Sequence, residues 1–293
     1  YYLLAAEGGT EDGHMVTISR SQSVWGPWEP CPHNPILTHR SLDRPIQATG
    51  HGDLVQARDG HWWLVFLGTR PVGYPRYHLL GRETFLAPVT WKDGWPVVGN
   101  NGTVDLEMDA PLPASQPWDK VEPVLDPFDS PTLGFHWNWL RNPDPGRYSL
   151  TTRPGWLRLT GAESTLDDTA SPTFLGRRQR HLKCVVSTLV EFFPRDDNEE
   201  AGLVALGDNT HHYEIGITRK SRERTILVRR RIGSLQAVVA RKPLPDGPVQ
   251  LRVEADEAWY IFSWRIGNDN WSELARGETR YLGSEAGAAM FTG

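Results

Sequence analysis

Long apolar runs are absent from this sequence of 293 residues. No stretch of about 18 consecutive apolar residues occurs, and no charged segment followed by an apolar one opens the chain, so neither a membrane span nor a signal peptide is predicted. The formal charge is only −5, and no basic arm or aromatic RNA-binding motif is present, which argues against a nucleic-acid partner. The one dense basic stretch, residues 219–231, alternates with strand-forming residues and indicates a solvated strand pair. The compartment, secreted or cytoplasmic, stays open.

Several catalytic signatures are also lacking. The sequence has no phosphate-cradling glycine loop, no paired Cys-x-x-Cys spacing and no Gly-x-Ser-x-Gly elbow. Its two cysteines, Cys31 and Cys184, could pair or stay free, and they do not fix the compartment. Tryptophan, glycine and proline are abundant instead, with 13, 28 and 23 residues. Such a composition is typical of β-proteins, and we expect most Trp rings in the core and a minority against sugar rings.

The first part of the chain, residues 1–115, contains short apolar runs separated by Gly, Pro, Asn and Asp. Runs such as 13–19, 61–67 and 89–91 predict antiparallel strands, and the run 61–67 predicts a strand buried on both faces. No convincing helical periodicity is present. The spacing favours four-stranded blades of a β-propeller.

A segment rich in Pro, Asp and Glu predicts a linker at residues 116–129, which separates a second domain at 130–293. Alternating apolar and polar residues in this second part predict a β-sandwich. The predicted strands are 156–160, 185–192, 213–217, 225–228, 249–253 and 259–264. The histidine pair at 211–212 precedes the predicted strand 213–217 and is interpreted as a junction between loop and strand. Because adjacent strand residues point to opposite faces, these two histidines are not expected to share a metal ion.

Glu7 is the strongest single candidate for catalysis. It ends the apolar run Tyr1–Ala6 and is followed by Gly8 and Gly9. Removal of a carboxyl group from water raises its pKa, which would suit a proton donor for a sugar leaving group. The ordinary interpretation is an exposed glutamate without a function.

Several motifs in order strengthen the catalytic interpretation. They are Ala6–Thr10, Gly13–Met15, Ser19–Ser21, Trp25–Glu29, Gly50–His51, Leu80–Thr84, Trp91–Pro96, Phe174–Gln179 and Phe291–Gly293. Together they resemble the β-xylosidase and α-L-arabinofuranosidase group of glycoside hydrolase family 43 over nearly the whole chain. The resemblance implies an all-β protein, in which part of a five-bladed β-propeller is followed by a concanavalin-like β-sandwich.

The resemblance also implies a reaction. Family members hydrolyse glycosides with inversion, using an Asp base, a second Asp that tunes the acid, and a Glu acid. Only the acid matches this chain, at Glu7. We therefore expect both Asp residues upstream of Tyr1 and a sandwich that continues past Gly293. On this interpretation the chain is a piece of a hydrolase, is inactive alone, and needs a missing N-terminal piece or a homo-oligomer to cover its open sheet edges.

Two further residues match the family's sugar pocket. Arg82 resembles the arginine at the bottom of the pocket, where a planar fork of donors can bind ring hydroxyls. Its structural alternative is an ion pair with the neighbouring Glu83. His51 resembles the histidine on the propeller axis, which meets the sugar site through water or a calcium ion; the alternative is a hydrogen-bonded core histidine. No cofactor is required, and calcium is the one metal considered.

Three residues complete the set of candidates. His14 and Arg20 accompany Glu7 in its motif and could position or tune it, with scaffold packing as the alternative. Phe291 matches a Phe of the sandwich that closes one wall of the pocket in relatives, with an ordinary core position as the alternative.

The implied substrate is a short β-1,4-xylo-oligosaccharide, shortened by one xylose at a time from its non-reducing end. An arabinosyl substrate is the near competitor. A carbohydrate-binding protein without catalysis is the alternative from another class, since it needs no Asp base.

Overall fold

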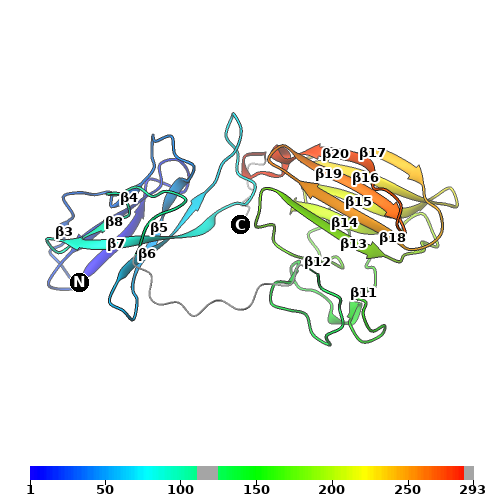
Figure 1. The fold of residues 1–293 in the computed structure, drawn as a ribbon, viewed down its shortest axis with the longest axis horizontal. Helices are drawn as coiled ribbons and strands as arrows, with labels where there is room; N and C mark the ends of the chain where they lie inside the picture. The colour runs from blue at the N-terminus through cyan, green and yellow to red at the C-terminus, as the bar shows by residue number, and fades with distance from the viewer. Residues whose placement is uncertain (111–124, 287–293) are drawn as a thin grey trace. The chain divides into compact units, whose positions relative to one another are not determined.

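The computed structural model describes residues 1–110 and 125–286. These residues divide into two compact units, one within 1–110 and the other within 125–286 (Figure 1). The described part of the chain contains strands, a few one-turn 3-10 helices and no α-helix. The all-β prediction is therefore confirmed. Of the predicted linker, residues 116–124 lie outside the described residues. Asp126 accepts a hydrogen bond of 2.6 Å from the indole of Trp137, so the far end of that segment packs onto the second unit.

The first sheet of the first unit is built on the hairpin of β1 (Tyr2–Glu7) and β2 (Met15–Arg20). Two short strands, β3 (Glu29–Pro30) and β4 (Leu37–Thr38), both pair with β2 on its other side. β1 is consequently an edge strand, and its first residues, Tyr2 and Leu3, are exposed.

The second sheet of this unit is a simple antiparallel meander. Its strands are β5 (Gln47–Gln56), β6 (Trp62–Thr69), β7 (Glu83–Lys92) and β8 (Trp95–Val98), paired in that order. This is the arrangement that the sequence predicts for one propeller blade. β6 is largely buried, but Val65 is 36 % exposed, so the expectation that both faces are buried holds only in part.

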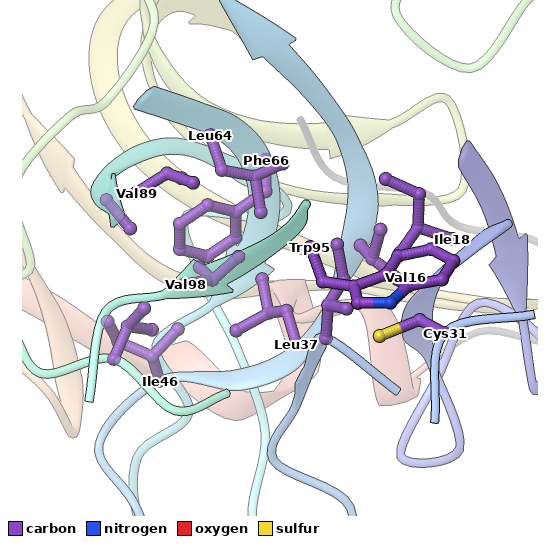
Figure 2. Close-up of a cluster of buried hydrophobic side chains, with 13 residues drawn as sticks. Val16, Ile18, Cys31, Leu37, Ile46, Leu64, Phe66, Val89, Trp95 and Val98 are labelled. Atoms are coloured by element: carbon purple, nitrogen blue, oxygen red, sulfur yellow. The ribbon is translucent and has the colours of Figure 1, made fainter. Parts of the chain in front are cut away.

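A core formed by both sheets joins them into one unit. Val16, Ile18 and Leu37 of the first sheet meet Leu64, Phe66 and Val98 of the second (Figure 2). The alternation in β2 explains this packing: Val16 and Ile18 are buried, and Thr17 between them points to the opposite face. The sheet therefore presents a buried face to its neighbour and a second face that carries other side chains.

The second unit is built around two four-stranded antiparallel sheets. One contains β13 (Cys184–Val190), β18 (Val249–Ala255), β19 (Trp259–Ile266) and β20 (Ser272–Glu278). The other contains β14 (Glu200–Asp208), β15 (His211–Lys220), β16 (Glu223–Ile232) and β17 (Leu235–Pro243). Two-residue pairs, β9 (Asn138–Trp139) with β12 (Leu175–Gly176) and β10 (Tyr148–Ser149) with β11 (Arg158–Leu159), precede them. The short 3-10 helices are η1 (Pro145–Arg147), η2 (Thr279–Leu282) and η3 (Ser284–Ala286).

The two sheets of this unit share one core, as in a sandwich. Ile215 and Val228 of one sheet pack with Leu251 and Phe262 of the other. β18 shows why: Val249, Leu251, Val253 and Ala255 are buried, and the polar residues between them are only partly covered. The predicted β-sandwich is present. Both cysteines are free, with Cys31 buried in the core of the first unit and Cys184 on β13.

The sequence analysis did not single out three of the sandwich strands, β14, β17 and β20. β17 is largely exposed, which makes its pattern weak. The predicted strand 156–160 shrinks to a two-residue pair at Arg158–Leu159. The basic stretch 219–231 does form a strand pair, β15 with β16, as expected.

Candidate functional site

Glu7 is the last residue of β1 and lies opposite Met15 in the hairpin register. Its side chain is on the face opposite to Val16 and Ile18 and is exposed. The Oγ1 hydroxyl of Thr17 donates a hydrogen bond of 2.8 Å to its Oε1. The burial that the sequence analysis expected around this carboxyl group is not provided by residues 1–110. Its assignment as the acid stays a prediction.

The glycine-rich loop after Glu7 folds back tightly on itself. Gly8 has φ +78°, and a Cβ placed there would lie 1.8 Å from the carbonyl oxygen of Gly13. Only glycine fits such a close approach of two backbone segments. The loop also carries Thr10, whose Oγ1 lies 3.5 Å from Nη1 of Arg82. The turn that ends β1 therefore places the acid candidate and the arginine candidate at the same end of the unit.

His14 follows Gly13 at the end of this loop and is only 3 % exposed. Its Nδ1 is 3.1 Å from the carbonyl oxygen of Ala48, so this nitrogen carries the proton and donates. Burial lowers the pKa of His14; the bond to Ala48 opposes that effect, and the charges of His51 and Arg82 add to it. His14 is therefore a neutral, buried side chain at neutral pH. This favours packing over direct substrate contact, which stays a prediction.

Gly50 is required by the ring of His14. A Cβ at this position would lie 2.4 Å from the Cδ2 and Nε2 atoms of that ring. The adjoining backbone is irregular: Ala48 and His51 have φ of +51° and +50°, and the pairing of β5 with β6 shifts register on both sides of Gly50. Non-glycine residues in this conformation are strained, and such strain collects at functional sites.

His51 follows Gly50 in the sequence, and its side chain is exposed. It lies close enough to His14 to affect the pKa of that group. Calcium prefers oxygen ligands, which an imidazole does not supply. Within residues 1–110 and 125–286, no group of three or more His, Cys, Asp or Glu side chains could hold a metal ion. The described side chains do not fit a directly bound ion, and a contact through water stays a prediction.

Arg82 stands directly before β7, after Gly81 with φ +72°. Glu83, the partner considered for Arg82 in the alternative interpretation, receives a bidentate ion pair from Arg70, with distances of 2.9 Å and 2.8 Å. Arg82 is exposed and approaches the Glu7 loop at Thr10.

Arg20 does not belong to the site. It lies opposite Tyr2, at the other end of the hairpin from the Glu7–Met15 pair, which places it about 17 Å from Glu7 along the strand. It forms an ion pair of 2.8 Å with Glu29 and lies 4.2 Å over the ring of Trp95. The suggestion that Arg20 tunes Glu7 is therefore wrong, and the packing alternative is right.

Phe291 lies outside the described residues, so its predicted place in the pocket wall stays a prediction. The structure does bring Glu7, His14, His51 and Arg82 to one end of the first unit. A separate hollow of about 560 Å³ is lined by Tyr2, Leu4, Asp53, Leu54, Trp62 and Trp91. It includes none of the four candidate residues.

Two residues of the site escaped the sequence analysis. Thr17 contacts Glu7 only because of the hairpin register, which pairs Ala5 with Thr17 and Glu7 with Met15. Gly50 was noted within a motif, but not its contact with His14. The alternating pattern of residues 15–20 was the one signal that placed Thr17 on the same face as Met15.

The histidine pair of the second unit is structural. His211 begins β15, and His212 is fully buried with its Nε2 3.2 Å from Glu214 and 3.4 Å from Asp167. The sequence interpretation as a junction between loop and strand is confirmed. Among the described residues, no helix is long and apolar enough to cross a membrane.

Comparison with known proteins agrees with the two-unit division. The model of glycosyl hydrolases family 43 matches residues 1–96, and that of the beta xylosidase C-terminal concanavalin A-like domain matches residues 125–293. The non-reducing end alpha-L-arabinofuranosidase BoGH43B of Bacteroides ovatus is 43% identical over 100% of this chain and 55% of its own length. The beta-xylosidase of Bacillus subtilis is 33% identical over 100% of this chain and 58% of its own length.

Solved structures give the same result. The GH43B protein from the xyloglucan locus (PUL) of Bacteroides ovatus superposes with a TM-score of 0.94 at 43% identity, covering 100% of this chain and 58% of that protein. The xylan beta-1,4-xylosidase of Bacillus halodurans gives 0.93 at 33% identity, covering 99% of this chain and 57% of that protein. The chain spans little more than half the length of these relatives. Its sequence and its fold, propeller blades followed by a concanavalin-like sandwich, show that the chain belongs to glycoside hydrolase family 43.

Proposed function

We propose that the full-length protein is an inverting glycoside hydrolase that releases xylose from the non-reducing end of β-1,4-xylo-oligosaccharides, with Glu7 as its general acid. The observation that supports this role is the placement of Glu7: a carboxyl group at a strand end, held by Thr17 and followed by a loop that reaches Arg82. The Bacillus subtilis relative named beta-xylosidase matches the whole chain.

In this mechanism, Glu7 gives its proton to the glycosidic oxygen while the bond to the anomeric carbon breaks. A base on the other side of the sugar activates a water molecule, which requires the two carboxyl groups to be about 6.5–9.5 Å apart. We place that Asp base, and the Asp that tunes the acid, outside residues 1–293. Arg82 would bind sugar hydroxyls with its planar fork of donors.

The first experiment tests both the stereochemistry of hydrolysis and the role of Glu7 as the general acid. The full-length protein is incubated with 4-nitrophenyl β-D-xylopyranoside, whose leaving group is not a sugar, and the anomer of xylose formed first is identified by proton NMR. Release of α-xylose from the β-linked substrate supports inversion, and release of β-xylose contradicts it. Turnover of xylobiose by Glu7→Gln equal to that of the wild type would contradict the assignment of the acid, because a sugar leaving group needs the proton.

A second candidate function, α-L-arabinofuranosidase, is favoured by the higher identity to the Bacteroides ovatus arabinofuranosidase, 43% against 33% for the Bacillus subtilis xylosidase. The values of kcat/KM on 4-nitrophenyl β-D-xylopyranoside and 4-nitrophenyl α-L-arabinofuranoside distinguish the two. The larger value identifies the main activity.

A non-catalytic carbohydrate-binding role makes the opposite prediction. It requires xylo-oligosaccharide binding by the full-length protein, measured by calorimetry, without turnover of either glycoside. We also propose that residues 1–293 alone are inactive. Efficient hydrolysis of an aryl xyloside by the isolated chain would contradict that statement. A calcium ion that meets His51 through water is retained as a hypothesis, and no step is assigned to it.

A further inference from the structure

The hydroxyl of Thr17 holds the side chain of Glu7 by a hydrogen bond. Its Oγ1 donates to Oε1 of Glu7 at 2.8 Å. The contact follows from the register, because Glu7 lies opposite Met15 and Thr17 is two residues further along the same face of β2. Strand β2 is itself anchored, since Val16 and Ile18 on either side of Thr17 are buried in the core. The hydroxyl donor is therefore carried by a strand whose position is fixed by the core.

This contact distinguishes the two oxygens of the carboxyl group. A carboxyl oxygen that carries the proton is a poor acceptor, whereas the other oxygen accepts readily. Because Thr17 donates to Oε1, the proton of the acid form resides on Oε2. The hydrogen bond therefore selects which oxygen delivers the proton, and it limits rotation of a side chain that is otherwise exposed.

We propose that Thr17 is a positioning residue for Glu7, which directs the acidic proton to Oε2 and stabilises the carboxylate left after proton transfer. The inference rests on the proposed function. When the proton passes from Oε2 to the glycosidic oxygen and the bond to the anomeric carbon breaks, Glu7 becomes an anion. Hydrogen bonds to ionised acceptors are stronger than those to neutral ones. Thr17 keeps its own proton, and its bond to Oε1 strengthens as the reaction proceeds.

A specific dependence on the leaving group follows. A sugar leaving group needs full protonation, whereas a nitrophenolate is a stable anion that needs little help from an acid. The loss of Thr17 should therefore slow hydrolysis of xylobiose more than hydrolysis of 4-nitrophenyl β-D-xylopyranoside. A general loss of folding or binding would lower both rates equally.

The experiment uses the full-length protein and three variants. Thr17→Val removes the hydroxyl and keeps the shape, and Thr17→Ser keeps the donor. Ser19→Ala removes a hydroxyl two residues further along the same strand, opposite Leu3 rather than Glu7. For Thr17→Val we expect kcat on xylobiose to fall about two- to tenfold, the worth of one hydrogen bond, with KM little changed. The rate on the nitrophenyl substrate should stay within about twofold, as should both rates for Thr17→Ser and Ser19→Ala.

The basic limb of the pH profile for xylobiose gives a second readout. Loss of a donor to the carboxylate makes Glu7 a weaker acid, so this limb should move to higher pH in Thr17→Val and return in Thr17→Ser. Equal losses on both substrates, or an unshifted limb, would overturn the inference while the proposed function stands. If Glu7→Gln leaves xylobiose turnover intact, the proposed function itself fails.

Discussion

The two ends of the β1–β2 hairpin differ in what their side chains do. At the Tyr2 end, Arg20 is committed to Glu29 and to the ring of Trp95, and the Tyr2 hydroxyl donates to the carbonyl oxygen of Gly94 at 2.6 Å. At the Glu7 end, an exposed carboxyl group meets one hydroxyl and a tight glycine turn. The comparison shows that a single hairpin can serve as scaffold at one end and present an exposed carboxyl group at the other.

The largest expected effect tests this division with two matched carboxyl groups. Glu7→Gln should lower kcat on xylobiose by about 10²–10⁴-fold, the usual contribution of a general acid, without a change in Tm because the side chain is exposed. Glu29→Gln, at the opposite end, should leave kcat unchanged. Steady-state kinetics and thermal unfolding of both variants check this. A comparable loss of activity in Glu29→Gln would remove the distinction between the two ends.

Gly50→Ala should have the next largest effect. Its Cβ would lie 2.4 Å from the buried ring of His14, and such overpacking costs about 1–3 kcal/mol of unfolding free energy. Urea unfolding measures the loss. The variant His14→Ala lacks the obstructing ring. The loss of unfolding free energy caused by Gly50→Ala should therefore be smaller in the His14→Ala background than in the wild type. Additive costs would show that the two residues are not coupled.

A smaller effect is expected in the pH dependence of stability. Burial lowers the pKa of His14 in the folded state below its usual 6.5, so the unfolded chain binds the proton more readily. Stability should then be complete above about pH 6.5 and fall as the pH drops below it. Burial also lowers the pKa of His39, which contributes in the same direction. In His14→Gln, the decrease in Tm between pH 7 and pH 5 should be smaller than in the wild type. A decrease equal to that of the wild type would exclude His14 as a source of the pH dependence of stability.

Arg20→Met should give the smallest effect. Methionine can still pack on Trp95, but it loses the exposed ion pair with Glu29, the hydrogen bond to the carbonyl oxygen of Asp93 and the cation–π attraction to the ring, each of which contributes little at an exposed site. We expect a slight decrease in Tm and unchanged kcat/KM on xylobiose. A change in the pH profile of the reaction would show that Arg20 does act on Glu7 after all, and would revive the role that its distance from Glu7 argues against.

Local patterns accounted for the fold class and for the position of Glu7. The apolar run before Glu7 and the glycines after it indicated a strand end, and the alternation in residues 249–253 indicated a sandwich strand. The contacts of the site could not be derived in this way. Thr17 meets Glu7 through strand register, and Gly50 meets His14 across 36 positions of sequence, which no local pattern specifies.

The ion-pair partner of Glu83 could not be derived from its neighbours in the sequence. Arg70, on the loop that follows β6, forms the ion pair with Glu83 at the start of β7. The Arg20 suggestion failed because position in a motif was taken for proximity in space.

The register shifts on either side of Gly50 make the length of β5 as important as its composition. After the second shift, Leu54 packs against the core and Val55 is exposed. Deletion of one residue between Gln47 and Asp53 would exchange these two faces, because side chains alternate along a strand. Homologous segments should therefore tolerate substitutions at positions other than Gly50 better than insertions or deletions, and a designer who shortens this strand would turn an apolar face toward water.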